Sequence, residues 1–146
     1  HPDIDLRILA ADSLKHLTED EFDIALFYCR TPPTDFRVTP LFSEKVFPVC
    51  SPSYLAKHPY LQDPARLAEG TLLSLEADQE WLGWDDWFRE CGQPPATGSS
   101  RRLNINSYPL VVQAALNGQG IALAWANLAG SIVLTLVVWT VFVWVG

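Results

Sequence analysis

The sequence predicts an α/β domain built on a mostly parallel sheet, and three observations support this prediction. Short apolar runs alternate with segments of helical periodicity, which is typical of strand–helix–strand units. The chain has 146 residues, which is enough for about one domain. Its 49% hydrophobic residues and six Trp indicate a packed core and exclude a disordered chain.

The first part of the chain contains four strand candidates. Residues 4–10 alternate loosely, and residues 22–28 form a compact apolar run, which is typical of a strand buried on both faces of a parallel sheet. Residues 38–42 and 45–50 follow. Because Pro48 has no N–H to donate, it places the last candidate at a sheet edge or in a crossing segment.

Two helical segments begin with the same start signal. Ser51 is suited to cap a helix whose first position is Pro52. Asp63 and Pro64 repeat this pattern, and Gly70 ends the second segment.

A third helix is predicted to begin at Asp78 and to end at Gly92. Its apolar side chains recur at i, i+3, i+7 and i+10 and form one stripe. A tryptophan cage for a cation is the alternative interpretation of this segment, but two of its tryptophans lie on the stripe and favour core packing. The stripe consists of Trp81, Trp84, Phe88 and Cys91, and Trp87 lies off it.

The remaining elements continue the α/β alternation. Residues 71–75 and 103–106 are predicted strands, and Ser107 is predicted to cap an uncharged helix over residues 108–117. Residues 120–125 form the last predicted strand.

The charge balance argues against nucleic-acid binding by this chain. Ten Lys and Arg stand against seventeen Asp and Glu, which gives a net charge of −7 and no basic face for phosphates. The sequence contains no nucleophile elbow, zinc-protease motif or phosphate-binding loop, so we expect no catalysis and no cofactor. Cys29, Cys50 and Cys91 have no metal-ligand spacing and are expected to be free thiols in a reducing cytoplasm.

The start of the helix over residues 108–117 is the most informative candidate site. Ser107 and Tyr108 follow a strand, and the free N–H groups of a helix start suit a carboxylate or another anion. The plainer interpretation is an ordinary cap on a core helix. Four further residues occupy equivalent positions after strands, where surface loop residues are the alternative: Tyr28, Arg30, Ser74 and Glu76.

The end of the chain differs from the rest. No charged residue follows Arg102, and residues 130–146 are almost wholly apolar. Three interpretations remain open for this tail: a foreign end produced by a frameshift, a membrane anchor, and a strand or helix that completes the fold.

Several segments together resemble the effector domains of LysR-type transcriptional regulators, in the branch with the glycine-cleavage, β-lactamase and choline-sulfate regulators. The resemblance covers about residues 1–129. It lies in HPDIDLR at residues 1–7, FDIAL at 22–26, VCSPSYL at 49–55, NSY at 106–108 and GQGIAL at 118–123.

The resemblance implies two Rossmann-like subdomains of the type 2 periplasmic-binding-protein kind, with the fold incomplete at both ends of the chain. Residues 1–50 would belong to the first subdomain, residues 51–125 would form the second, and residues 126–146 are the atypical tail. A small effector, such as an amino acid, a carboxylate or a quaternary amine, would bind between them. The resemblance places six residues around it: Tyr28, Arg30, Ser74, Glu76, Ser107 and Tyr108.

The resemblance also implies partners. DNA would be bound only through a winged helix that precedes this region, and the intact regulator would be a dimer or tetramer. A periplasmic-type solute-binding protein, a membrane-tethered α/β domain and a small hydrolase or transferase are the alternatives. The hydrolase would need a nucleophile–base pair, which the sequence does not show.

Overall fold

The computed structural model describes residues 5, 7–8, 22–26, 31–76, 81–93, 100–127, 137–138 and 143–145. These residues form one mixed sheet in the order β3-β2-β4-β1-β5, with β6 also paired to β1. The strands are β1 (Glu44–Cys50), β2 (Thr71–Leu75), β3 (Arg101–Ile105), β4 (Ile121–Trp125), β5 (Val137–Val138) and β6 (Val143–Val145). The helices are α1 (Pro52–Lys57), η3 (Pro59–Gln62), η4 (Pro64–Glu69), α2 (Trp84–Glu90) and α3 (Tyr108–Leu116).

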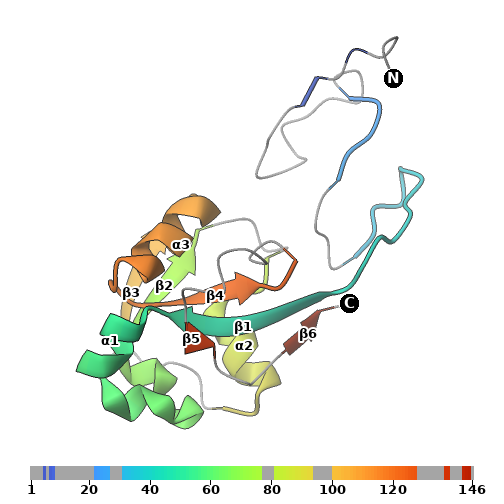
Figure 1. Ribbon diagram of the computed structural model, residues 1–146. Coiled ribbons are helices and arrows are strands. Elements are labelled where there is room, and N and C mark those ends of the chain that lie inside the picture. The colour runs from blue at the N-terminus through green and yellow to red at the C-terminus, as the bar shows by residue number, and fades with distance from the viewer. Residues whose placement is uncertain are drawn as a thin grey trace.

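The centre of the sheet follows the predicted α/β pattern. β2 pairs in parallel with both β3 and β4, while β1 runs antiparallel to β4, β5 and β6. The helix α2 leads from β2 to β3, and α3 leads from β3 to β4. The sheet is therefore parallel where the strand–helix–strand units lie and antiparallel where β1 joins it (Figure 1).

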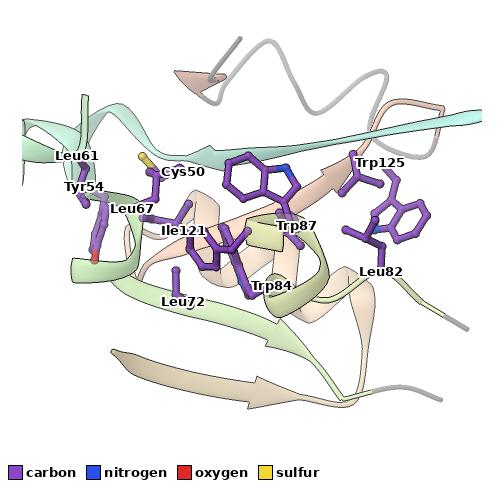
Figure 2. Packing of buried hydrophobic residues seen from close by; sticks show 13 residues of the cluster. Cys50, Tyr54, Leu61, Leu67, Leu72, Leu82, Trp84, Trp87, Ile121 and Trp125 are labelled. Carbon is purple, nitrogen blue, oxygen red and sulfur yellow. The ribbon is translucent and has the colours of Figure 1, made fainter. Parts of the chain in front are cut away.

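Two hydrophobic clusters cover the two faces of the sheet. On one face, Trp84, Trp87 and Phe88 of α2 pack on alternate residues of the strands, including Leu72 and Ile121. Figure 2 shows Trp84, Trp87 and Ile121 between α2 and the strands, with Tyr54 and Leu61 at one end and Trp125 and Leu82 at the other. On the opposite face, α3 packs on the strand residues that alternate with those of the first cluster: Phe47, Val49, Leu73, Ala122 and Ala124. The period of two within each strand thus assigns one helix to each face.

Predictions for the first part of the chain need correction. Residues 22–26 form no strand, and the side chains of Ile24 and Leu26 are 84% and 78% exposed. Residues 38–42 also form no strand, and residues 31–43 extend away from the sheet before β1 begins (Figure 1). An apolar run becomes a buried strand only where neighbouring strands pair with it, and no described strand does so here. Of residues 4–10, the structure describes only 5 and 7–8, without a strand.

The strand predicted at residues 45–50 is present as β1, but it is not at the sheet edge. The amide of Ala126 donates to the carbonyl of Lys45 at 2.9 Å. The backbone N–H and C=O groups of the odd-numbered residues of β1 therefore point toward β4. The backbone nitrogen of Pro48 therefore points to the other edge of β1, where β6 pairs with residues 44–46 and β5 with residues 49–50. The missing N–H of Pro48 falls at the break between these two strands, which explains how a central strand tolerates a proline.

The predicted caps of the first two helical segments are confirmed. The amide of Tyr54 donates to Ser51 Oγ at 3.2 Å, and the amide of Ala65 donates to Asp63 Oδ1 at 3.0 Å. Each of these side chains satisfies an otherwise unpaired amide of a first turn.

The third helix begins later than predicted. α2 starts at Trp84 with Gly83 as its N-cap, and the predicted start at Asp78 lies outside the described residues. The carboxylate of Asp86 accepts from the Gly83 amide at 3.3 Å, so an acidic side chain of the first turn supplies the cap. Gly92 ends the helix as predicted, with a φ of 65° that favours glycine.

The apolar tail contributes strands to the sheet. Residues 137–138 pair with Val49 and Cys50, and residues 143–145 pair with residues 44–46. These pairings support the structural interpretation of the tail over a foreign end. Within the described part of the chain, no helix is both long and apolar enough to cross a membrane.

Candidate functional site

A cavity of about 490 Å³ opens where the parallel strands end. Its walls come from the ends of β2, β3 and β4, from the residues around the start of α2, and from the first turns of α3. The lining residues are Leu73, Ser74, Leu75, Glu76, Trp81, Leu82, Gly83, Trp84, Asp85, Asp86, Arg102, Asn104, Tyr108, Val111, Leu123 and Trp125. Carboxyl ends of strands are where open α/β sheets bind ligands.

The cavity exists because β2 and β4 separate. β2 pairs with β3 along its whole length, from Thr71 to Leu75, but with β4 only at Leu72 and Leu73. Beyond Leu73 the two strands have no paired residues. Backbone groups that a continuous sheet would pair must therefore find other partners.

Two aromatic side chains bind backbone groups at this separation. Trp84 Nε1 donates to the carbonyl of Leu73 at 3.0 Å, from the α2 side of the sheet. The amide of Trp125 donates to the hydroxyl of Tyr108 at 3.3 Å, at the start of α3. Both aromatic rings also line the cavity. Trp84 and Tyr108 thus form hydrogen bonds with backbone groups where β2 and β4 separate, and they also form part of the cavity wall.

The charged groups of the cavity are mainly acidic. Arg102 donates to both carboxylate oxygens of Asp85, with the Nη1–Oδ2 distance at 3.1 Å. Asp86 is paired with Arg89, and both pairs are at least partly exposed. Glu76 has no ion-pair partner within the described ranges, and its side chain is exposed. One carboxylate of the lining therefore remains available to a ligand.

The hydroxyls of the site differ in their environment. Ser74 Oγ is buried and has no hydrogen-bond partner among the described residues. Burial raises the pKa of Tyr108, the charge of Glu44 raises it further, and the hydrogen bond from the Trp125 amide opposes this effect. Tyr108 therefore keeps its proton at neutral pH and can donate it.

The structure brings three of the six predicted site residues to the cavity: Ser74, Glu76 and Tyr108. Ser107 is at the N-cap of α3 as predicted, but its side chain makes no capping hydrogen bond, and it is not part of the lining. Tyr28 and Arg30 lie outside the described residues.

Several lining residues were not singled out from the sequence. Asn104 lies beside Ser74 in the β2–β3 register, and Arg102 lies beside Leu72 on the same face. The alternation of Arg102 and Asn104, two apart on one strand, was the available signal. Asp85 and Asp86, which resemble an exposed helix face in the sequence, also line the cavity. Trp84 packs in the core as predicted and lines the cavity as well.

Neither of the two thiols that the structure describes, Cys50 and Cys91, lines this site. Burial raises the pKa of Cys50 to about 11, so that thiol stays protonated at neutral pH. Burial also raises the pKa of Cys91, with a smaller contribution from Glu90. No group of three or more metal-ligating side chains occurs within the described part of the chain.

The chain matches a protein-family model over most of its length. The model described as "LysR substrate binding domain" matches residues 1–139. The matched range includes β1 to β5, among them all three parallel strands, and all of the cavity lining, whereas β6 lies beyond it. It also extends into the apolar tail, beyond about residue 129, where the resemblance in the sequence ends.

Individual proteins give the same result. The chain is 35% identical over 130 residues to the glycine cleavage system transcriptional activator of Escherichia coli K12, which covers 85% of this chain and 39% of that protein. The effector domain of the transcriptional regulator AmpR of Pseudomonas aeruginosa aligns with a TM-score of 0.59 and 27% identity over 73% of this chain and 50% of that chain.

A third protein shows a likeness of fold alone. CrgA, a LysR-type transcriptional regulator from Neisseria meningitidis, aligns with a TM-score of 0.75 and 24% identity over 94% of this chain and 46% of that chain. The chain therefore spans about two fifths of its curated relative and about half of each of these solved structures.

Proposed function

This chain belongs to the LysR substrate-binding domain family, the effector-binding part of LysR-type transcriptional regulators, and from this premise we propose that its cavity receives a small amine-bearing effector. The family is one of regulator domains and not of enzymes. The observation that carries the proposal is the cavity at the carboxyl ends of β2, β3 and β4.

The dimensions and lining of the cavity support a small ligand. Its volume of about 490 Å³ is within the range of about 300–1,000 Å³ that is usual for small-molecule sites. Apolar walls from Leu73, Val111 and Leu123 are combined with a few polar groups, including Ser74 and Asn104. Such a combination excludes water with the apolar surface and orients the ligand with the polar atoms.

The charges favour an amine over a simple carboxylate. The lining holds the carboxylates of Glu76, Asp85 and Asp86 and one guanidinium, that of Arg102, which Asp85 already engages. A ligand cation can therefore pair with Glu76, and the indole of Trp81 in the same wall can support it through a cation–π contact. Of the three candidate effector classes, amino acids and quaternary amines fit this wall better than carboxylates.

The same proposal includes the remainder of the regulator. Tyr28 and Arg30 would face this cavity from a first Rossmann-like subdomain to which residues 1–50 contribute, and β1 would carry the chain into a second subdomain over residues 51–125. A separate winged-helix domain would bind DNA in a cytoplasmic dimer or tetramer. Such an arrangement would convert effector binding into a change of operator contact.

Substituting Glu76 by glutamine is expected to weaken amine binding. The change keeps the size of the side chain but removes its charge. The ammonium of glycine would lose a charged hydrogen bond of about 1.5–3 kcal/mol, so its dissociation constant should rise by about ten-fold or more. Choline has no N–H on its quaternary nitrogen and would lose only the charge attraction, so its dissociation constant should rise less. Isothermal titration calorimetry of the 146-residue chain with choline, glycine and acetate tests this expectation. Glycine is included because one relative is named as the transcriptional activator of the glycine cleavage system.

Glu90→Gln is the matched control, because it makes the same charge change at the end of α2 outside the cavity lining. Its dissociation constants should equal those of the wild type. Binding of acetate without choline or glycine would refute the amine preference but retain the site. If none of the three compounds binds, the assignment of this cavity to such an effector is wrong.

A further inference from the structure

Three consecutive amides at the end of β4, those of Trp125, Ala126 and Asn127, are each held by a different partner. The amide of Trp125 donates to the Tyr108 hydroxyl at 3.3 Å, and the amide of Ala126 donates to the carbonyl of Lys45 at 2.9 Å. The amide of Asn127 donates to Glu44 Oε1 at 2.8 Å. We refer to these three hydrogen bonds as the exit clamp.

Glu44 occupies an unusual position for a carboxylate. It is only 6% exposed, and it is the first residue of β1, where the chain enters the sheet. Its hydrogen bond to Asn127 joins this entry point to the segment by which the chain leaves β4. A buried carboxylate is costly unless its oxygens accept hydrogen bonds, and Glu44 Oε1 accepts from the amide of Asn127 and, at 3.2 Å, from that of Lys45.

The opposite end of the exit clamp is in the wall of the cavity. Tyr108 lines the cavity, and its hydroxyl is the acceptor of the first hydrogen bond of the series. The charge of Glu44 also acts on Tyr108, where it adds to the effect of burial on the pKa of the phenol. Contacts among a few residues thus link the cavity to the start of β1 and to the segment that follows β4.

We propose that the exit clamp couples the cavity to the two segments by which the chain enters and leaves the sheet, with Tyr108 and Glu44 as its positioning residues. A ligand that contacts Tyr108 changes how firmly the amide of Trp125 is held. Because successive amides share a backbone, a turn of the first peptide group also alters the hydrogen bonds of Ala126 and Asn127. The inference rests on the proposed function only in assigning the ligand to this cavity.

The chain contains a matched tyrosine away from the cavity. The amide of Thr71 donates to the Tyr54 hydroxyl at 2.9 Å, so this phenol also holds a strand amide 17 residues further along the chain. That hydrogen bond is at the start of β2, whereas the exit clamp is at the end of β4. Tyr54→Phe therefore removes an equivalent hydrogen bond without touching the exit clamp.

Amide hydrogen exchange measured by NMR on the ligand-free 146-residue chain tests the coupling directly. In Tyr108→Phe, exchange of the amides of Trp125, Ala126 and Asn127 should accelerate by about five-fold, as expected for the loss of about one net hydrogen bond. In Tyr54→Phe, only the amide of Thr71 should respond. Acceleration confined to Trp125 in Tyr108→Phe would overturn the coupling.

A second variant and a ligand complete the test. Glu44→Gln keeps an oxygen acceptor but replaces a charged hydrogen bond by a neutral one, so exchange of Asn127 should accelerate by about five-fold, and unchanged exchange would overturn the role of Glu44 in the clamp. Saturating choline should change exchange at Asn127 in the wild type and not in Tyr108→Phe. Choline that binds without this change overturns the clamp, whereas failure of choline to bind overturns the proposed function and leaves the ligand-free result intact.

Discussion

Replacing Gly120 with alanine is expected to lower the free energy of unfolding by about 2–3 kcal/mol, the upper part of the range for an overpacked core. An added Cβ would be 2.5 Å from the carbonyl oxygen of Thr71 and 3.0 Å from Leu73 Cγ. The first of these atoms belongs to the backbone of β2 and cannot move aside as a side chain can. The variant must therefore separate β2 from β4 where they still pair, at Leu72 and Leu73.

Urea unfolding followed by circular dichroism measures this loss. Gly83→Ala is the matched control, because a Cβ at that position meets no atom within 4 Å. Only its weaker capping should register, at less than about 1 kcal/mol. Equal losses in the two variants would show that the contact with Thr71 does not limit the packing of β2 against β4.

The second half of the fold was predictable because its signals are local. Ser51 and Asp63 each precede a proline and cap a first turn by contacts within three residues. The strands over residues 71–75 and 121–125 have apolar sequences that suit burial from either side. Each of these elements is specified by side chains close to it in the chain.

Elements that depend on distant partners were predicted less well. The apolar run at residues 22–28 has the composition of a buried strand, but residues 22–26 have no described strand to pair with. Conversely, the tail supplies β5 and β6, although its composition indicated a foreign end or an anchor as readily as strands. Strand pairing is a property of two segments, and one segment alone cannot reveal it.

The candidate site shows the same division. Ser74, Glu76 and Tyr108 were found because the ends of parallel strands collect ligand-facing groups. Asn104 was missed because only the register with β2 places it beside Ser74. The ion pair between Arg102 and Asp85, 17 residues apart, joins β3 to α2 and likewise depends on how the helix packs.

Trp84→Phe is expected to cost more stability than the same change at Trp87, although both indoles are buried in the same cluster. Each change removes similar packing volume, which costs about 1–2 kcal/mol. Trp84 alone donates its Nε1–H to the Leu73 carbonyl at the separation of β2 and β4. Losing that bond removes one net hydrogen bond, which adds about 0.5–1.5 kcal/mol and brings the total to about 1.5–3.5 kcal/mol.

Trp87 provides the comparison because its Nε1 is buried without a hydrogen-bond partner among the described residues. Phenylalanine at this position removes a polar group that is already unsatisfied, so only the packing loss remains. Urea unfolding of the two variants, followed by circular dichroism, gives the difference between their free energies of unfolding from the two midpoints, provided that the dependence of the free energy on urea concentration is the same in both. If Trp87→Phe were as destabilising as Trp84→Phe, the hydrogen bond to Leu73 would not stabilise the separated strands. The cavity would then be held open by side-chain packing alone.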